Sequence, residues 1–139
     1  MARTAGGQHP QPKEIIFSDL APSLRAHPVT KKPVVLKNAD AIKRAIKNLI
    51  LTNKYERPYE PDYGGNVLDM LFENFDPLLE ERMRGRIERT IGNYEPRVTI
   101  NNITVNANED QNELIVSIAF TPQNSMRQEE LTVELQRTR

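Results

Sequence analysis

The sequence predicts an α+β domain in which about three helices precede a C-terminal three-stranded antiparallel β-meander. Between residues 38 and 93, apolar side chains recur every three or four positions, which is the period of a helix. After Pro96 the apolar period changes to two, in three runs separated by short polar turns. Because the helices precede the strands and do not alternate with them, the pattern favours α+β over a parallel α/β sheet.

A single domain, residues 15–139, is expected to follow a flexible N-terminal extended arm, residues 1–14. The length of 139 residues fits one domain. The arm holds two glycines and two prolines and has too little apolar surface to offset the entropy cost of ordering. His9 lies in this arm without a neighbouring ligand, so it is assigned no metal role.

Short extended pieces are expected between the arm and the first helix. Residues 15–17 (IIF) are a candidate strand, and residues 34–36 (VVL) are a second extended segment. Pro22, Pro28 and Pro33 prevent longer elements here. This segment is expected to run over the surface of the domain.

An amphipathic helix of about 12 residues is expected to begin at Asn38 or Asp40, because either side chain suits an N-cap. Its apolar face consists of Ile42, Ile46, Leu49 and Ile50. A loop over residues 52–65 follows, with two prolines, two adjacent glycines and three tyrosines. A loop of this length is usually functional or packed on the surface.

Two further helices are expected before the strands. The first is short, residues 66–75, with four apolar side chains on one side: Leu68, Leu71, Phe72 and Phe75. Asp76 as N-cap and Pro77 as first residue open the next, which reaches about Asn93. Its apolar positions are four residues apart: Leu79, Met83, Ile87 and Ile91. Gly85 weakens this helix by about 1 kcal/mol relative to Ala, so it is expected to admit another backbone at close range.

Three strands are expected at residues 97–106, 113–121 and 130–137. The first changes phase at Asn101–Asn102, which a β-bulge would reconcile. The second points Leu114, Val116, Ile118 and Phe120 toward the core, and the third alternates Leu131, Val133 and Leu135. Charges around the last strand either guard an open edge against aggregation or flank an edge that accepts a strand from another protein.

The formal net charge of +0 conceals two oppositely charged halves. Residues 1–58 carry 11 Lys+Arg and 4 Asp+Glu, a net charge of +7, and the rest of the chain carries −7. The halves either neutralise each other within the fold or present complementary faces to different partners. The chain lacks Cys, an apolar run long enough to span a membrane, and an N-terminal signal pattern, so we expect a soluble protein without disulfides or a membrane partner.

Catalysis is not expected. The acid pairs Glu80–Glu81 and Glu129–Glu130 lie in polar surroundings, whereas glycoside hydrolysis needs one carboxyl group of raised pKa. The two histidines, His9 and His27, lie in the proline-rich region, and no glycine-rich phosphate-binding motif or clustered metal ligands occur. We expect no cofactor, no metal and no small-molecule substrate.

Nucleic acid is not an expected partner either. Four arginines lie on the long helix, at Arg82, Arg84, Arg86 and Arg89. They spread around the helix, and glutamates interleave them at pairing distances. A solvated or subunit-contacting face is therefore favoured.

The tripeptide Glu95–Pro96–Arg97 joins the last helix to the first strand. Proline fixes its own φ and keeps the preceding residue extended, so the joint is stiff. One interpretation is a simple helix stop with both charges solvated. The alternative is a rigid elbow that presents a carboxylate and a guanidinium fork to a partner.

Three segments, taken in order, resemble the small baseplate wedge protein, or sheath initiator, of contractile phage tails and related injection systems. They are residues 41–65 (AIKRAIKNLILTNKYERPYEPDYGG), residues 71–77 (LFENFDP) and the Tyr94–Arg97 segment (YEPR). Residues 17–20 (FSDL) also fit the start of this family. The resemblance covers roughly residues 15–136, and the order and spacing of the segments make it specific.

The resemblance implies a non-enzymatic structural subunit, located in the tail baseplate of a virion and assembled in the host cytoplasm. It implies that Glu95, Pro96 and Arg97 dock on a helical core bundle of neighbouring wedge subunits. It also implies that the β-meander initiates the first ring of the tail sheath protein by strand exchange, with Leu131, Val133 and Leu135 as sheath-facing candidates. The tail tube is a further candidate partner.

Two alternatives and one departure accompany the resemblance. The family was formerly described as a tail lysozyme, so a murein hydrolase is one alternative, and a regulatory adaptor on the same fold is the other. The departure is Tyr55, which stands where the family has Gly. Because a positive φ strains Tyr, the loop is expected to differ in shape there.

Overall fold

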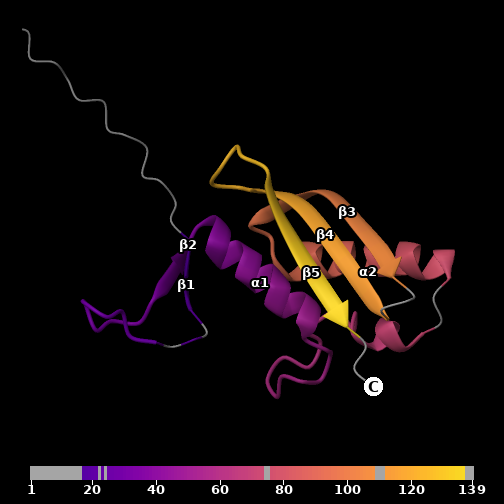
Figure 1. Cartoon of the computed structure of the whole chain (residues 1–139), viewed down its shortest axis with the longest axis horizontal. Helices are drawn as coiled ribbons and strands as arrows, with labels where there is room; N and C mark the ends of the chain where they lie inside the picture. Colours follow the sequence, from indigo (N-terminus) through magenta and orange to yellow (C-terminus); the bar gives the residue numbers. More distant parts are fainter. Residues whose placement is uncertain (1–16, 22, 24, 74–75, 109–111, 137–139) are drawn as a thin grey trace, which may run out of the picture.

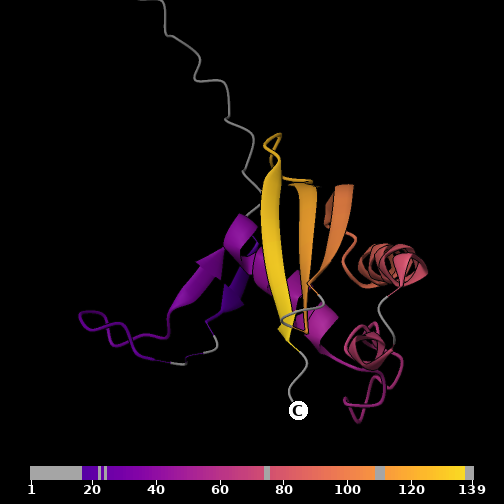
Figure 2. The same cartoon turned by 45° about the vertical axis from the view of Figure 1, so that its right-hand side comes forward.

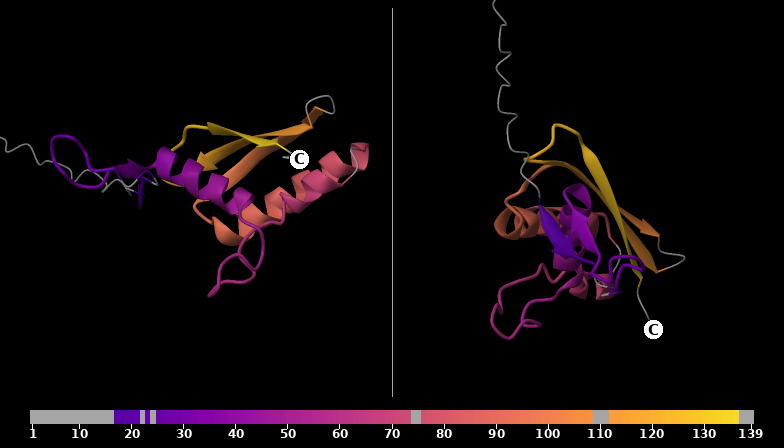
Figure 3. Two further views of the ribbon diagram at one scale, coloured as in Figure 1. Left: turned by 60° about the horizontal axis from the view of Figure 1, so that its bottom comes forward. Right: turned by 90° about the vertical axis from the view of Figure 1, so that its left-hand side faces the viewer.

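The computed structural model describes residues 17–21, 23, 25–73, 76–108 and 112–136. Strands β3 (Val98–Asn108), β4 (Glu113–Pro122) and β5 (Glu129–Gln136) form an antiparallel sheet in the order β3-β4-β5. Helices α1 (Ala39–Leu51) and α2 (Pro77–Tyr94) cover one face of this sheet (Figures 1 and 3). The predicted α+β class and the meander are confirmed.

The first helix has the predicted buried face but not the predicted cap. Its four apolar positions are at most 1% exposed. Asn38 precedes the helix with φ 50° and makes no side-chain capping bond. Its Oδ1 instead accepts hydrogen bonds from the Phe17 N–H, at 3.2 Å, and from the Asn124 side chain, at 3.2 Å. The side chain thus links three distant segments.

Helix α2 begins as predicted, whereas the short helix before it does not form over its predicted length. The Asp76 Oδ1 accepts the Leu79 N–H at 2.6 Å, and Pro77 occupies the first turn. Instead of a helix over residues 66–75, only the 3₁₀ turn η1 (Asp69–Phe72) is present. Phe72 is exposed, so it does not share the buried side with Leu71; Phe75 lies outside the described residues. An isolated short segment cannot offset the cost of helix nucleation.

The register of the sheet explains the phase change in β3. Ile100 pairs with Phe120, and Asn102 pairs with Ala119, so Asn101 is the extra residue of a β-bulge. The bulge turns Ile103 and Val105 to the core face, where both are buried. The predicted bulge is therefore confirmed.

The core lies between the sheet and the two helices. Phe120, Val116 and Leu114 of β4 are 0% exposed and belong to one apolar cluster with the buried residues of α1 and α2. Gly85 of α2 is not a close-approach site, because a Cβ atom there would meet nothing within 4 Å. The expectation of another backbone packed on Gly85 is wrong.

Strands β1 (Ser18–Leu20) and β2 (Val35–Lys37) form a separate antiparallel hairpin. The predicted strand at residues 15–17 is displaced: residues 15 and 16 lie outside the described residues, and β1 begins after Phe17. The hairpin and its connecting loop project from the body of the molecule (Figures 1 and 2) and do not run over its surface as expected. Most of its described side chains are exposed.

Within the described residues, one long-range ion pair joins the two oppositely charged halves. Lys43 of α1 contacts Glu129 of β5, with Nζ and Oε2 2.7 Å apart. Lys31 and Lys32 lie in the segment that connects β1 to β2, and this hairpin projects from the body of the molecule (Figure 2). Internal neutralisation of the two halves is thus partial.

Candidate functional site

The elbow Glu95–Arg97 lies where α2 gives way to β3. Glu95 is the residue after the helix, and its N–H donates to the Ile91 carbonyl at 2.8 Å. Pro96 has no N–H and cannot extend the helix. Strand β3 then begins at Val98. The elbow is a fixed joint between the two elements that build the core.

Glu95 and Arg97 form a two-point ion pair with each other. The Arg97 Nε donates to Oε1 of Glu95 at 2.5 Å, and Nη2 donates to Oε2 at 2.6 Å. The Glu95 side chain is 7% exposed, whereas that of Arg97 is 35% exposed. The interpretation in which both charges are solvated is therefore wrong. Glu95 positions Arg97, and only the guanidinium has an outward edge.

The contact with Glu95 stabilises the protonated form of Arg97. Its side-chain hydrogen bond to Glu95 raises the pKa of the guanidinium, while burial acts in the opposite direction. The upward shift of this pKa favours the protonated guanidinium. The elbow therefore presents a guanidinium in a fixed orientation, with its charge balanced by the Glu95 carboxylate.

Residues distant in sequence hold the elbow in place. The Gln123 side chain donates to the Pro96 carbonyl at 2.7 Å, and its N–H donates to the Arg97 carbonyl at 2.9 Å. Phe17 lies under the guanidinium, with the Arg97 Cζ 5.3 Å from its ring centre. The β4–β5 turn and the base of the hairpin thus both contact the elbow.

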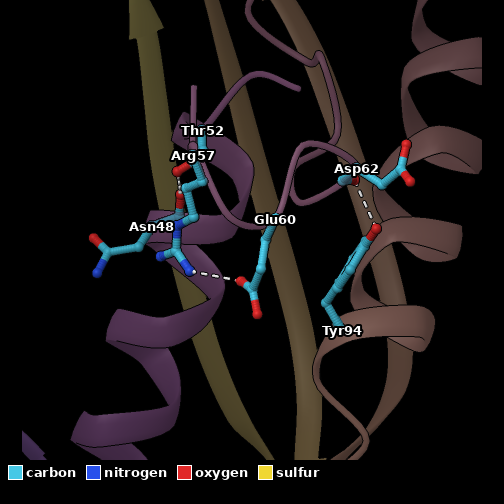
Figure 4. A network of polar contacts seen from close by, with 6 residues as sticks. All are labelled: Asn48, Thr52, Arg57, Glu60, Asp62 and Tyr94. Carbon is cyan, nitrogen blue, oxygen red and sulfur yellow. Dashed lines mark hydrogen bonds and ion pairs between the residues drawn. The ribbon is translucent and has the colours of Figure 1, made fainter. Parts of the chain in front are cut away.

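The loop over residues 52–66 packs against the end of α2 beside the elbow (Figure 4). Tyr94 donates its hydroxyl to the Asp62 carbonyl at 2.6 Å, and its ring meets that of Tyr63 edge to face at 5.3 Å. Arg57 covers Tyr63, with Cζ 3.7 Å from the ring centre, and contacts Glu60 at 3.3 Å. This stack connects the loop to the residue that precedes Glu95.

The loop is closed by backbone contacts that require glycine at one position. Gly64 has φ +110°, and a Cβ atom there would lie 2.3 Å from the Thr52 carbonyl oxygen. The Tyr55 N–H donates to the Pro61 carbonyl at 2.8 Å, and the Lys54 N–H donates to the Asn66 side chain at 2.6 Å. These hydrogen bonds give the loop a defined shape, although residues 54–62 are exposed.

A family model described as "Baseplate wedge protein gp25" matches residues 37–126, which is more than half of the chain and includes α1, the 52–66 loop, the elbow and two strands of the sheet. The chain belongs to this family. The predicted resemblance and the predicted location in the tail baseplate are both confirmed.

The baseplate wedge protein gp25 of Enterobacteria phage T4 is 37% identical to this chain over 81 residues. The match covers 58% of this chain and 61% of the T4 protein, less than two thirds of its length. A candidate tail lysozyme from Geobacter sulfurreducens is similar in structure, with TM-score 0.68 and 19% identity over 76% of this chain and 97% of that one. A chain of the anti-feeding prophage baseplate gives TM-score 0.61 and 22% identity over 86% and 85%. At these identities the two structures show a shared fold.

Tyr55, the departure from the family pattern, adopts a left-handed backbone conformation. Tyr55 has φ 68°, in the left-handed region that suits Gly. The expected difference in loop shape at this residue stays a prediction. Tyr55 is 79% exposed, so few contacts offset the strain, and the surrounding hydrogen bonds hold the conformation.

We expect Tyr55→Gly to raise the free energy of unfolding by about 0.5 kcal/mol. Relief of about 1–2 kcal/mol of left-handed strain exceeds the added entropy of Gly in the unfolded chain. Urea denaturation followed by circular dichroism would measure the change. Tyr59→Gly is the control: Tyr59 is exposed without a positive φ, so this change should lower stability. Equal effects of the two substitutions would contradict the strain at Tyr55.

Tyr63 should ionise late in an alkaline titration. Burial raises the pKa of its phenol, the charge of Arg57 lowers it, and the charge of Glu95 adds to the rise. The folded state therefore holds this proton more tightly than the unfolded state, and the associated stability is lost as pH rises above about 10. Absorbance near 295 nm should show a high-pH component that Tyr63→Phe removes. An unchanged upper part of the titration curve would be inconsistent with this assignment.

The sheath-facing candidates on β5 do not point away from the body. Val133 and Leu135 are at most 2% exposed, and Leu131 packs against the same apolar cluster. Their side chains face the helices, so this strand can offer a partner only its backbone edge and its outward side chains. Both β3 and β5 pair with one neighbour within the described sheet.

The acid pairs considered for catalysis make structural contacts. Glu80 accepts the Ala107 N–H at 3.2 Å, and Glu81 accepts two hydrogen bonds from Arg84 at 2.7 Å. Glu129 pairs with Lys43. Among the residues that the structure describes, no group of three or more metal-ligating side chains occurs, and no helix is long and apolar enough to cross a membrane.

Sequence reasoning located the elbow but missed the residues that fix it. Phe17, Asn38 and Gln123 lie 21 or more positions from their partners along the chain. No local pattern signals such contacts, because neither periodicity nor motif spacing depends on them. The resemblance at residues 17–20 was the only sequence signal that pointed to Phe17.

Proposed function

We propose that the chain is a structural wedge subunit that docks on a helical core bundle of neighbouring wedge subunits and starts the tail sheath. The observation that carries the docking role is the preorganised Arg97. The guanidinium donates two hydrogen bonds to the buried Glu95 carboxylate, which fix its orientation before any partner arrives. Docking then orders no flexible side chain at this point, which lowers the entropy cost of binding.

The chemistry of the elbow suits a helical partner. Arg97 has N–H donors beyond the two used by Glu95, and a guanidinium binds carboxylates and the carbonyls at a helix C-terminus well. Because proline fixes its own φ, Pro96 limits bending of the backbone at the elbow. Continuity with the Tyr94 stack gives the docking surface a second rigid edge.

The docking role can be tested with the double variant Glu95→Gln/Arg97→Gln. Because the two amides can replace the ion pair, the domain should remain folded while the guanidinium is lost. The variant would be co-expressed with the other wedge subunits of the same tail, and its share in the wedge complex measured by size-exclusion chromatography. Less than a tenth of the wild-type share is expected.

The matched control is Glu81→Gln/Arg84→Gln. It makes the same two changes at another Glu–Arg pair with two contacts, one that lies exposed on α2. This control should enter the complex normally. Normal entry of the elbow variant would reject docking through Glu95–Arg97.

Sheath initiation is proposed to occur at the open edge of β5. Its backbone can pair with an incoming strand of the sheath protein, as in β-augmentation. The side chains of Val133 and Leu135 would hold the strand on the helices while its edge is engaged. Amide hydrogen exchange with and without sheath protein should show new protection in β5. Protection confined to β3 would assign initiation to the other edge.

The proposal excludes murein hydrolysis as the function. It is supported by the structural contacts of the acid pairs and by family membership. A zymogram of the purified protein should show no clearing. Clearing that disappears when one glutamate is replaced would overturn this part of the proposal.

A further inference from the structure

A pocket of about 330 Å³ lies between the 52–66 loop and the last turns of α2. The loop contributes Lys54 and the backbone of Gly64 and Gly65, and the helix contributes Arg86, Arg89 and Tyr94. A Cβ atom at Gly65 would meet the Thr90 hydroxyl at 3.0 Å, so loop and helix approach closely at one wall. The contact between Gly65 and Thr90 therefore forms one wall of the pocket.

Three positive side chains converge on this pocket, and its lining includes no Asp or Glu. Within the described part of the chain, Lys54, Arg86 and Arg89 take part in none of the ion pairs. Arg89 donates Nε to the carbonyl of Gly85 on its own helix at 3.1 Å. We call this feature the basic pocket.

The other arginines of α2 are arranged differently. Arg82 pairs with Glu73 at 2.9 Å, and Arg84 pairs with Glu81. Arg86 and Arg89 are instead like charges three positions apart on one helix face, a spacing that lowers helix stability. Among the described residues, the other two arginines of α2 are paired with glutamates, whereas Arg86 and Arg89 are not. A local departure of this kind from stabilising pairing is expected at functional sites.

We infer that the basic pocket receives a carboxylate side chain from an acidic segment of another wedge subunit. This inference rests on the proposed docking function and names the chemistry of a second contact near the same end of α2. Tyr94 lines the pocket and directly precedes Glu95, so the pocket and the elbow share the last turn of this helix. The pocket would then bind a carboxylate of the partner that docks on the elbow.

A protein carboxylate fits the basic pocket better than a nucleic-acid backbone. A duplex or single strand needs a continuous basic track along its phosphates. Here the neighbouring arginines of α2 are neutralised by glutamates, which leaves a single local site. One or two carboxylates match its three charges.

The direct test measures binding of fluorescein-labelled octaglutamate to the purified protein by anisotropy at low salt. Arg86→Gln/Arg89→Gln should weaken binding by about tenfold or more, because two charge-assisted hydrogen-bonding groups are lost. The matched control Arg44→Gln/Lys47→Gln removes the same charge from α1, outside the pocket, and should change the affinity less than twofold. Both arginines of the pocket are exposed, so the variant should fold, as circular dichroism would verify.

Two results would overturn the inference. One is equal loss of octaglutamate binding in the pocket variant and the α1 control, which would indicate only a net-charge effect. The other is tighter binding of an eight-nucleotide oligothymidine than of octaglutamate, with the same dependence on Arg86 and Arg89. That result would assign the pocket to nucleic acid.

Co-expression with the other wedge subunits separates this inference from the docking proposal. If wild type enters the wedge complex and the pocket variant enters equally well, the pocket inference fails and docking stands. If wild type itself does not enter, the docking proposal fails, and octaglutamate binding still decides whether the pocket takes carboxylates. The expected result is entry of wild type and of the α1 control, and reduced entry of the pocket variant.

Discussion

Arg97→Ala should lower the free energy of unfolding by about 2–3 kcal/mol. The substitution leaves the Glu95 carboxylate buried without the two hydrogen bonds that now satisfy it. A buried charge that loses its partner is costly, and the 35% exposure of Arg97 places the loss below that of a fully buried pair. Urea denaturation at neutral pH, followed by circular dichroism, would measure it.

Replacing Glu95 should lower the free energy of unfolding less than replacing Arg97 does. Glu95→Gln leaves a guanidinium that can turn toward water, so we expect a loss of about 1 kcal/mol. The double variant Glu95→Gln/Arg97→Gln should be closer to wild type than Arg97→Ala. Equal losses from Arg97→Ala and Glu95→Gln would show that the burial of Glu95 does not govern the pair. This order of stabilities also makes the double variant the better probe of docking.

Gly64→Ala should have the largest effect of the single changes in the 52–66 loop, at about 3 kcal/mol or more. Its new Cβ would lie 2.3 Å from the Thr52 oxygen, and φ +110° is unfavourable for any side chain. Relief requires the loop to move away from the end of α1, which disturbs the stack of Arg57, Tyr63 and Tyr94. The midpoint of thermal unfolding would report the loss.

Gly85→Ala is the matched control for that experiment. It adds the same methyl group in the middle of α2, where nothing lies within 4 Å. Helix propensity alone should then raise stability by about 1 kcal/mol. The two substitutions are thus expected to act in opposite directions, and destabilisation by both would contradict the geometry at Gly85.

The helices and strands that form the core were predictable because their patterns are local. The spacing of four in α2 and the alternation in β4 each follow from one buried face. Even the bulge at Asn101 was readable, since the change of parity in β3 occurs within the strand itself. The cap at Asp76 likewise depends on neighbours three residues away.

The position of the elbow was predictable from the sequence, but the burial and pairing of its two charges were not. Whether Glu95 is solvated or buried depends on Phe17 and Gln123, which reach it only in the folded protein. The predicted capping role of Asn38 was wrong for the same reason. Its side chain accepts a hydrogen bond from the distant Phe17 N–H and does not cap the helix. The basic pocket combines one lysine from a loop with two arginines from a helix, and no spacing rule joins them.

The pairing of β4 with β5 bears on how force would pass through this subunit. All eight residues of β5 are matched with β4, from Glu129 opposite Phe120 to Gln136 opposite Glu113. If β5 engages the sheath protein as proposed, tension along β5 would load these pairs in shear, so that they share the tension and do not open one after another. The central strand is in turn anchored to β3 along its length. The sheet would then transmit tension between the proposed sheath contact at β5 and the proposed docking contact at the elbow.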